Sequence, residues 1–142
     1  MRSYLIVVNQ TFTSPTLAEA IADRIRQGEA AFHVVVPATP IGHGLTWDER
    51  ESFAAAEARL AEILERLRGI GAPATGEVGS KDPVAAVEDA MRSRQVDEVI
   101  LSTLPPGISR WLGQDVPSRL RAGISVPLTV VTAPREHARQ AT

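Results

Sequence analysis

Residues 4–36, YLIVVNQTFTSPTLAEAIADRIRQGEAAFHVVV, contain two short apolar runs on either side of a segment with helical spacing. The runs Tyr4–Val8 and Phe32–Val36 are apolar and rich in β-branched residues, which is typical of strands that are covered on both faces. Ser14 and Pro15 mark the start of the helix between them, with serine at the cap and proline at the first helical position. An apolar stripe then runs to the glycine that ends this helix: Leu17, Ala18, Ile21, Ala22, Ile25 and Gly28. The stretch predicts two parallel strands joined by a helix.

The rest of the chain continues this alternation. Three further segments have strand character, the first of them weakly: 74–78, 98–101 and 128–131. Three further helices have recognisable starts: Thr46 with Glu49 at capping-box spacing, Asp82 before Pro83, and Asp115 with Pro117 just inside. The helix after Thr46 carries apolar residues at helical spacing: Phe53, Leu60, Ile63, Leu64 and Leu67. The order predicts a single α/β domain over residues 1–142, with a mainly parallel sheet and right-handed crossovers that put helices on both faces.

Composition excludes several classes of protein. The chain is 44% hydrophobic and its net charge is −2, whereas a protein that grips nucleic acid normally has a strongly basic face. No run of eighteen apolar residues is present, and the first ten residues lack the features of a signal peptide, so we expect no membrane association and a cytoplasmic location. The sequence has no cysteine, which excludes disulfides and thiolate nucleophiles.

In an open parallel sheet, ligands bind beyond the carboxyl ends of the strands, where the strand order reverses. The residues just after those ends form a predicted polar rim: Asn9, Gln10 and Thr11 after the first strand, Pro37, Ala38 and Thr39 after the second, and Ser102 and Thr103 with the segment 104–111 after the fourth. No phosphate-binding glycine loop of the Walker type and no serine elbow is present. Three scattered histidines have no metal-ligand spacing, and His33, inside an apolar strand, is interpreted as a packed or edge histidine and not as a ligand. We predict no catalytic residue and no metal ligand.

Several segments of the chain together resemble the universal stress protein family. They are the first strand ending at Asn9, where that family has an aspartate, the second strand FHVVVP, the turn Gly79-Ser80-Lys81-Asp82-Pro83, and the segment from Glu98 to Val131. The resemblance covers essentially the whole chain. It implies a three-layer, open, twisted sheet of five strands in the order 3-2-1-4-5 and a homodimer formed through the last strand. Many members of the family hold an adenine nucleotide in the crevice, and the resemblance implies such a ligand here too.

The chain departs from that family's nucleotide signature, which is glycine, two residues, glycine, nine residues, glycine, then serine or threonine. Ser102 and Pro105 take the places of the first two glycines. The final pair falls near Gln114-Asp115, or on Gly113-Gln114 if the alignment of the loop contains a gap. Proline has no N–H to offer a phosphate, and a carboxylate at position 115 would repel one. Asp115 is also interpreted as the cap of the last helix.

These observations define the predicted ligand site. Six residues form its body and two close its phosphate end: Asn9, Thr11, Val36, Ser102, Thr103 and Gly107, with Gln114 and Asp115. An amide in place of an aspartate binds a metal ion less well, which favours AMP or a nucleoside over magnesium-ATP. ATP, if it binds, should bind weakly and gain little from magnesium.

The preferred function is therefore a small-ligand binding module of universal-stress type, regulatory in the stress response and without turnover. Two alternatives stay open: an enzyme of the same superfold with weak nucleotide hydrolase or transferase activity, and a structural dimer with an eroded pocket. The segment Pro127–Val131 is short, apolar and at the implied sheet edge, so we expect pairing with a second copy. An edge protected by Pro127 and the charged tail is the alternative.

Overall fold

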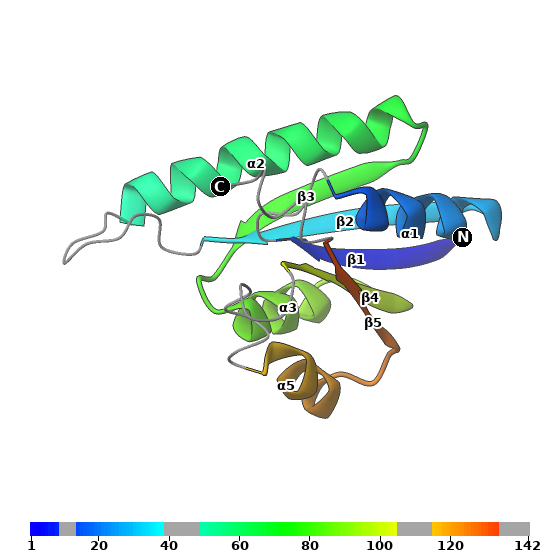
Figure 1. The fold of residues 1–142 in the computed structure, drawn as a ribbon. Coiled ribbons are helices and arrows are strands. Elements are labelled where there is room, and N and C mark those ends of the chain that lie inside the picture. Colours follow the sequence, from blue (N-terminus) through cyan, green and yellow to red (C-terminus); the bar gives the residue numbers. More distant parts are fainter. Residues whose placement is uncertain (9–13, 39–48, 105–114, 134–142) are drawn as a thin grey trace.

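The computed structural model describes residues 1–8, 14–38, 49–104 and 115–133 (Figure 1). Its strands are β1 (Arg2–Val8), β2 (Ala30–Pro37), β3 (Ala74–Gly79), β4 (Glu98–Thr103) and β5 (Leu128–Thr132). Its helices are α1 (Pro15–Arg26), α2 (Glu49–Gly69), α3 (Pro83–Arg92) and α5 (Val116–Gly123). Each predicted strand is present and is one or two residues longer at one or both ends, because backbone pairing continues beyond the apolar run.

The five strands form one sheet in the order β3-β2-β1-β4-β5, and every neighbouring pair is parallel. This confirms both the α/β class and the strand order that the resemblance implied. From β1 the chain moves outward through β2 to β3, and it then returns to the other side of β1 for β4 and β5. The strand order therefore reverses between β1 and β4.

Helices cover both faces of the sheet and make the predicted three layers (Figure 1). On one face, α1 and α2 bury Leu17, Ile21, Ala56, Ile63 and Leu67 against side chains of β1 and β2. On the other face, α3 and α5 bury Ala86, Val87, Ala90, Val116 and Leu120 against the alternate side chains of the same strands. Among the described helices, none has an apolar stretch long enough to cross a lipid bilayer.

Two helix starts show how far local sequence decides local structure. Asp82 caps α3 as predicted, since its carboxylate accepts a hydrogen bond from the Val84 N–H at 3.4 Å. Ser14 occupies the cap position of α1 but makes no capping bond. Its hydroxyl instead contacts the Thr16 hydroxyl at 2.7 Å, and Thr16 donates to the carbonyl of Thr132 at 3.0 Å. The first turn of α1 is thereby fastened to β5; the predicted cap at Thr46 lies outside the described residues.

At Gly79, β3 and α3 approach closely. A Cβ atom at this position would lie 2.8 Å from the Ala86 Cβ and 3.0 Å from a methyl group of Val35. Both neighbours belong to the buried layer beneath α3, where little space exists for either to move. A glycine is therefore required here for packing, whatever its backbone conformation.

We predict that Gly79→Ala lowers the free energy of unfolding by about 1–3 kcal/mol, because the added methyl overpacks this layer. Gly69→Ala is the matched control, since a Cβ there meets nothing within 4 Å. Urea titration of the two variants should show a loss of stability for the first and none for the second. Equal stability of both variants would contradict the packing argument.

A charged pair joins α1 to β4. The Arg24 guanidinium donates to both carboxylate oxygens of Glu98, at 2.7 Å and 3.3 Å, and the Thr129 hydroxyl donates to the same carboxylate. Both charged side chains are only 15% exposed. Burial raises the pKa of Glu98, but the hydrogen bonds from Arg24 and Thr129 outweigh it and hold that pKa below its ordinary value. The pair therefore stabilises the fold when Glu98 is ionised.

We predict that Glu98→Gln costs about 2 kcal/mol of stability at neutral pH, the scale of hydrogen bonds to a charged group. A lowered pKa means that the folded state binds this proton less readily than the unfolded chain. The contribution is thus full above the ordinary value of 4.5 and is lost as the pH falls through the lowered pKa. Urea titrations between pH 7 and pH 3 should show the variant and the wild type converging, whereas exposed Glu57→Gln should leave stability unchanged at every pH.

Candidate functional site

The carboxyl ends of β1 and β4 lie side by side at the point where the strand order reverses. Val8, the last residue of β1, is in register with Ser102 of β4. The next residue, Thr103, ends β4 and is in register with Thr132 of β5. The structure therefore brings the ends of the first and fourth strands together, as the sequence predicted, at the edge where parallel α/β sheets bind ligands.

Two hydroxyl side chains end β4 in a fully buried position. Ser102 and Thr103 both have 0% exposure. The Thr103 hydroxyl makes no hydrogen bond to any described residue. A buried hydroxyl without a partner costs about 1–3 kcal/mol, and groups of this kind are usually satisfied by a water molecule or a ligand. Thr103 is therefore a residue at this edge whose buried hydroxyl lacks a hydrogen-bond partner in the described part of the chain.

The predicted site residues divide between the two faces of the sheet, because successive side chains of a strand point to opposite faces. Val36 belongs to the buried cluster beneath α1 and α2, and Ser102 shares that face with Ile100. Thr103 points to the face that α3 and α5 cover, on the same side as Leu101. A ligand that contacts both groups has to lie across the ends of the strands.

Asp115 directly precedes α5, but the predicted capping bond is not formed. Its backbone is left-handed, with φ of 56° and ψ of 41°, and its side chain accepts no bond from the helix. A capping residue normally has extended backbone, which aims its side chain at the first free N–H groups. The Asp115 carbonyl alone takes part, accepting from the Arg119 N–H at 3.1 Å. The carboxylate is exposed at the start of α5 and is not committed to the helix.

Arg119 lies in α5, four residues after Asp115. Its guanidinium lies 3.6 Å from a carboxylate oxygen of Asp82, the residue that caps α3. Both side chains are nearly half-exposed, so the pair contributes little to stability. It does bring the starts of α3 and α5 together on one face. The other predicted contacts, Asn9, Thr11, Gly107 and Gln114, lie outside the described residues.

Sequence reasoning missed one further buried hydroxyl. Ser52 lies in the first turns of α2, is 2% exposed, and its hydroxyl makes no hydrogen bond within the described part of the chain. It is one helical turn before Ala56, which packs against the sheet. That spacing was the available signal, because a polar residue four positions before a buried one lies on the same helix face. The predicted stripe used Phe53 instead, and Phe53 is 47% exposed.

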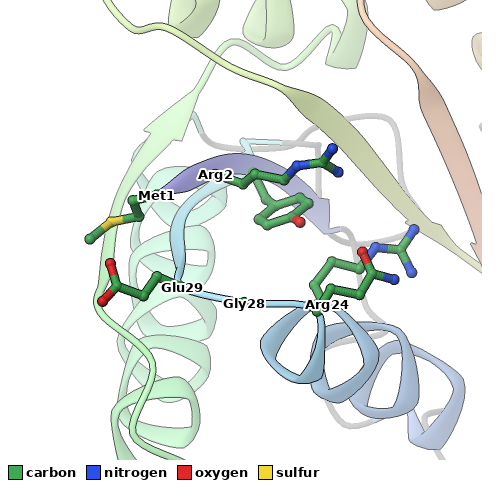
Figure 2. A pocket seen from close by; sticks show the side chains of 7 residues that line it. Met1, Arg2, Arg24, Gly28 and Glu29 are labelled. Carbon is green, nitrogen blue, oxygen red and sulfur yellow. The ribbon is translucent and has the colours of Figure 1, made fainter.

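A cavity of about 510 Å³ lies at the opposite, amino edge of the sheet. Arg2 and Arg24 are on one side of it, and Met1 and Glu29 are on the other (Figure 2). The guanidinium of Arg24 is already committed to Glu98. A second cavity of about 360 Å³ lies between α1 and α2 and is lined largely by aliphatic side chains. Within the described ranges, no three His, Cys, Asp or Glu residues gather closely enough to hold a metal ion.

Comparison with known proteins agrees with this architecture. No protein-family model matches the chain, and no curated protein matches it. Among solved structures, it is similar to a protein from the universal stress protein family of Burkholderia pseudomallei, with a TM-score of 0.59 over 91% of this chain and 94% of that one. The two sequences are 14% identical, so the likeness is one of fold. The resemblance inferred from the residues is thus confirmed at that level: the chain has a universal-stress-protein fold.

Proposed function

We propose that this protein is a small-ligand binding module of universal-stress type, which binds an adenine nucleotide or nucleoside at the carboxyl edge of β1 and β4. It acts in the cytoplasm as a regulatory protein of the stress response and does not turn its ligand over. The observation that carries the proposal is the Thr103 hydroxyl, fully buried at the strand-order reversal and without a partner among the described residues. A ligand hydroxyl, ring nitrogen or phosphate oxygen would satisfy it.

The charge of the site favours a ligand with few phosphates. Asp115 places an exposed carboxylate at the start of α5, where a phosphate chain would otherwise meet free backbone N–H groups. Pro105 has no N–H, and Asn9 has an amide in place of a metal-binding carboxylate. AMP or a nucleoside therefore fits this set of side chains better than magnesium-ATP.

Two other functions have specific tests. An enzyme of the same superfold, with weak nucleotide hydrolase or transferase activity, would release phosphate from ATP, and a phosphate-release assay detects this. A structural dimer with an eroded pocket would bind no nucleotide. Mass analysis of protein denatured directly after purification would reveal any small molecule that it carries.

We predict that calorimetry detects binding of AMP to the protein. ATP should bind more weakly than AMP, and magnesium should raise its affinity little. Thr103→Val should weaken AMP binding about fivefold or more, the scale of one lost hydrogen bond of about 1 kcal/mol. The same variant should stabilise the ligand-free protein, because it removes a buried hydroxyl that has no partner. Thr129→Val is the control: its hydroxyl is bonded to Glu98, so it should destabilise the protein and leave AMP binding unchanged.

Two outcomes would contradict this prediction. Tight ATP binding that depends on magnesium would contradict the argument from charge. Loss of stability in ligand-free Thr103→Val would show that the hydroxyl is satisfied without a ligand.

We also propose a homodimer through β5. The Val99 N–H bonds to the Pro127 carbonyl and the Ala133 N–H bonds to the Thr103 carbonyl, so the odd-numbered residues of β5 face β4. In a parallel ladder the alternate residues then direct their N–H and carbonyl groups away from the sheet: Leu128, Val130 and Thr132. The Thr132 carbonyl already accepts a hydrogen bond from Thr16, so the pairing between the two copies of β5 would centre on Val130. A two-fold partner would satisfy both edges at once.

We predict that sedimentation shows a dimer for the wild type and a monomer for Val130→Pro. Proline removes an N–H that faces away from β4, so the ladder within the chain is kept. Val78→Pro is the matched control, because Val78 has the same outward position on β3, the opposite edge strand. It should leave the dimer intact. A monomeric wild type at tens of micromolar would refute the proposal.

A further inference from the structure

Three polar side chains form a continuous hydrogen-bonded chain on β2 and β3, far from the carboxyl edge of β4. The Thr75 hydroxyl lies 2.7 Å from Nδ1 of His33, and Nε2 of His33 lies 2.7 Å from a carboxylate oxygen of Glu77. Thr75 is in register with His33, and Glu77 is two residues further along the same strand. All three side chains therefore point to the face of the sheet that α3 covers.

The carboxylate decides the direction of these hydrogen bonds. An ionised glutamate only accepts, so Nε2 of His33 must carry the proton that is donated to Glu77. In the neutral ring, Nδ1 is then an acceptor, and the Thr75 hydroxyl must donate to it. Protons are therefore donated from the hydroxyl to the imidazole and from the imidazole to the carboxylate. In this order, a serine or threonine hydroxyl becomes a nucleophile when the imidazole takes its proton.

The exposure of Thr75 and the protonation state of His33 suit the roles of nucleophile and base. Thr75 is exposed, whereas His33 is only 6% exposed and is held on both ring nitrogens. Burial lowers the pKa of His33 in spite of the bond to Glu77, and Arg94 lowers it further, so the ring is neutral and able to accept a proton at pH 7. A reagent in solution can therefore reach the hydroxyl, but it cannot readily reach the base.

The backbone supplies an N–H donor at the residue that follows Thr75. The Phe32 N–H bonds to the Pro73 carbonyl and the Ala38 N–H bonds to the Gly79 carbonyl, so the odd-numbered residues of β3 face β2. The N–H of Gly76 then points away from the sheet, on the outer side of the edge strand β3. In α/β-hydrolases, the residue after the nucleophile provides an N–H that stabilises the developing oxyanion. Gly76 has that position relative to Thr75.

From this geometry we infer that Thr75 is a nucleophile for small activated acyl esters, with His33 as its general base and Glu77 orienting the imidazole. The Thr75 oxygen attacks the acyl carbon while its proton passes to Nδ1 of His33. The bond from that carbon to the leaving oxygen then breaks, and the leaving group takes the proton. The product is an ester of Thr75, which water hydrolyses to restore the hydroxyl. This activity is separate from ligand binding at the carboxyl edge.

The test is acetylation by p-nitrophenyl acetate, followed by release of p-nitrophenol and by peptide mass analysis. The wild type should gain one acetyl group on Thr75. Thr75→Val should lose both the label and the fast release, whereas Thr75→Ser, which keeps a hydroxyl, should retain them. His33→Gln should slow acetylation about a hundredfold, the lower range for loss of a general base. Glu77→Gln should slow it less, because the amide oxygen can still accept from Nε2.

Ser118→Ala is the control, since it removes an exposed hydroxyl of α5 that bonds to no imidazole among the described residues, and it should react like the wild type. Thermal melting of every variant separates loss of the nucleophile from loss of the fold. Acetylation of Lys81 in place of Thr75, or equal reactivity of Thr75→Val and the wild type, would overturn the inference. In that case His33, Thr75 and Glu77 only satisfy one another's hydrogen bonds within the sheet. AMP binding should be unchanged in all these variants.

Discussion

The central strand β1 is enclosed on every side, and the rest of the fold follows from that constraint. From Tyr4 to Val8 each residue is buried, and the backbone pairs with β2 on one edge and with β4 on the other. Side chains on both faces need cover, so helices must lie above and below the sheet. The chain runs from β1 toward β2 and later returns to β4, which leaves the reversal of strand order beside the best-protected strand. The ligand site that we propose at that edge would therefore stand beside a rigid strand.

The polar groups at the two ends of the sheet differ in whether they have hydrogen-bond partners. At the amino edge, Arg24, Glu98 and Thr129 satisfy one another and join α1 to β4 and β5. At the carboxyl edge, the buried hydroxyls of Ser52 and Thr103 have no hydrogen bond within the described residues. A paired charge stabilises the folded chain by itself, whereas an unpaired buried hydroxyl does so only when something else supplies the partner. The paired charges at the amino edge therefore stabilise the fold by themselves, and the carboxyl edge is where we propose that the ligand binds.

The cluster of Thr75, His33 and Glu77 is assembled by strand pairing alone, without a loop. His33 and Thr75 are neighbours because β2 and β3 pair in register, and Glu77 reaches the ring because it is two residues along the same face. Such positions are rigid, since each side chain is held by the strand that carries it. The same arrangement also completes the hydrogen bonds of a buried imidazole, so the hydroxyl needs a chemical test to reveal its reactivity.

Local patterns were sufficient for most of the architecture. Apolar runs indicated each strand, and the step from Asp82 to Pro83 identified both the start of α3 and its capping residue, because capping depends on groups only two residues apart. The resemblance supplied the strand order, which periodicity cannot give. It also identified the ends of β1 and β4 as neighbours, and pairing of Val8 with Ser102 agrees.

The tertiary structure decided the direction in which each side chain points and therefore what it contacts. Ser14 and Asp115 both follow the sequence rule for a helix cap, yet Ser14 bonds to Thr16 and Asp115 has left-handed backbone, because the path of the chain into each helix aims the side chain elsewhere. Phe53 was in the apolar stripe, but the packing of α2 on the sheet buries Ser52 instead. His33 was correctly read as packed, although its partners lie more than forty residues away and no local pattern names them. Sequence periodicity determines which residues share a face; only packing determines what that face meets.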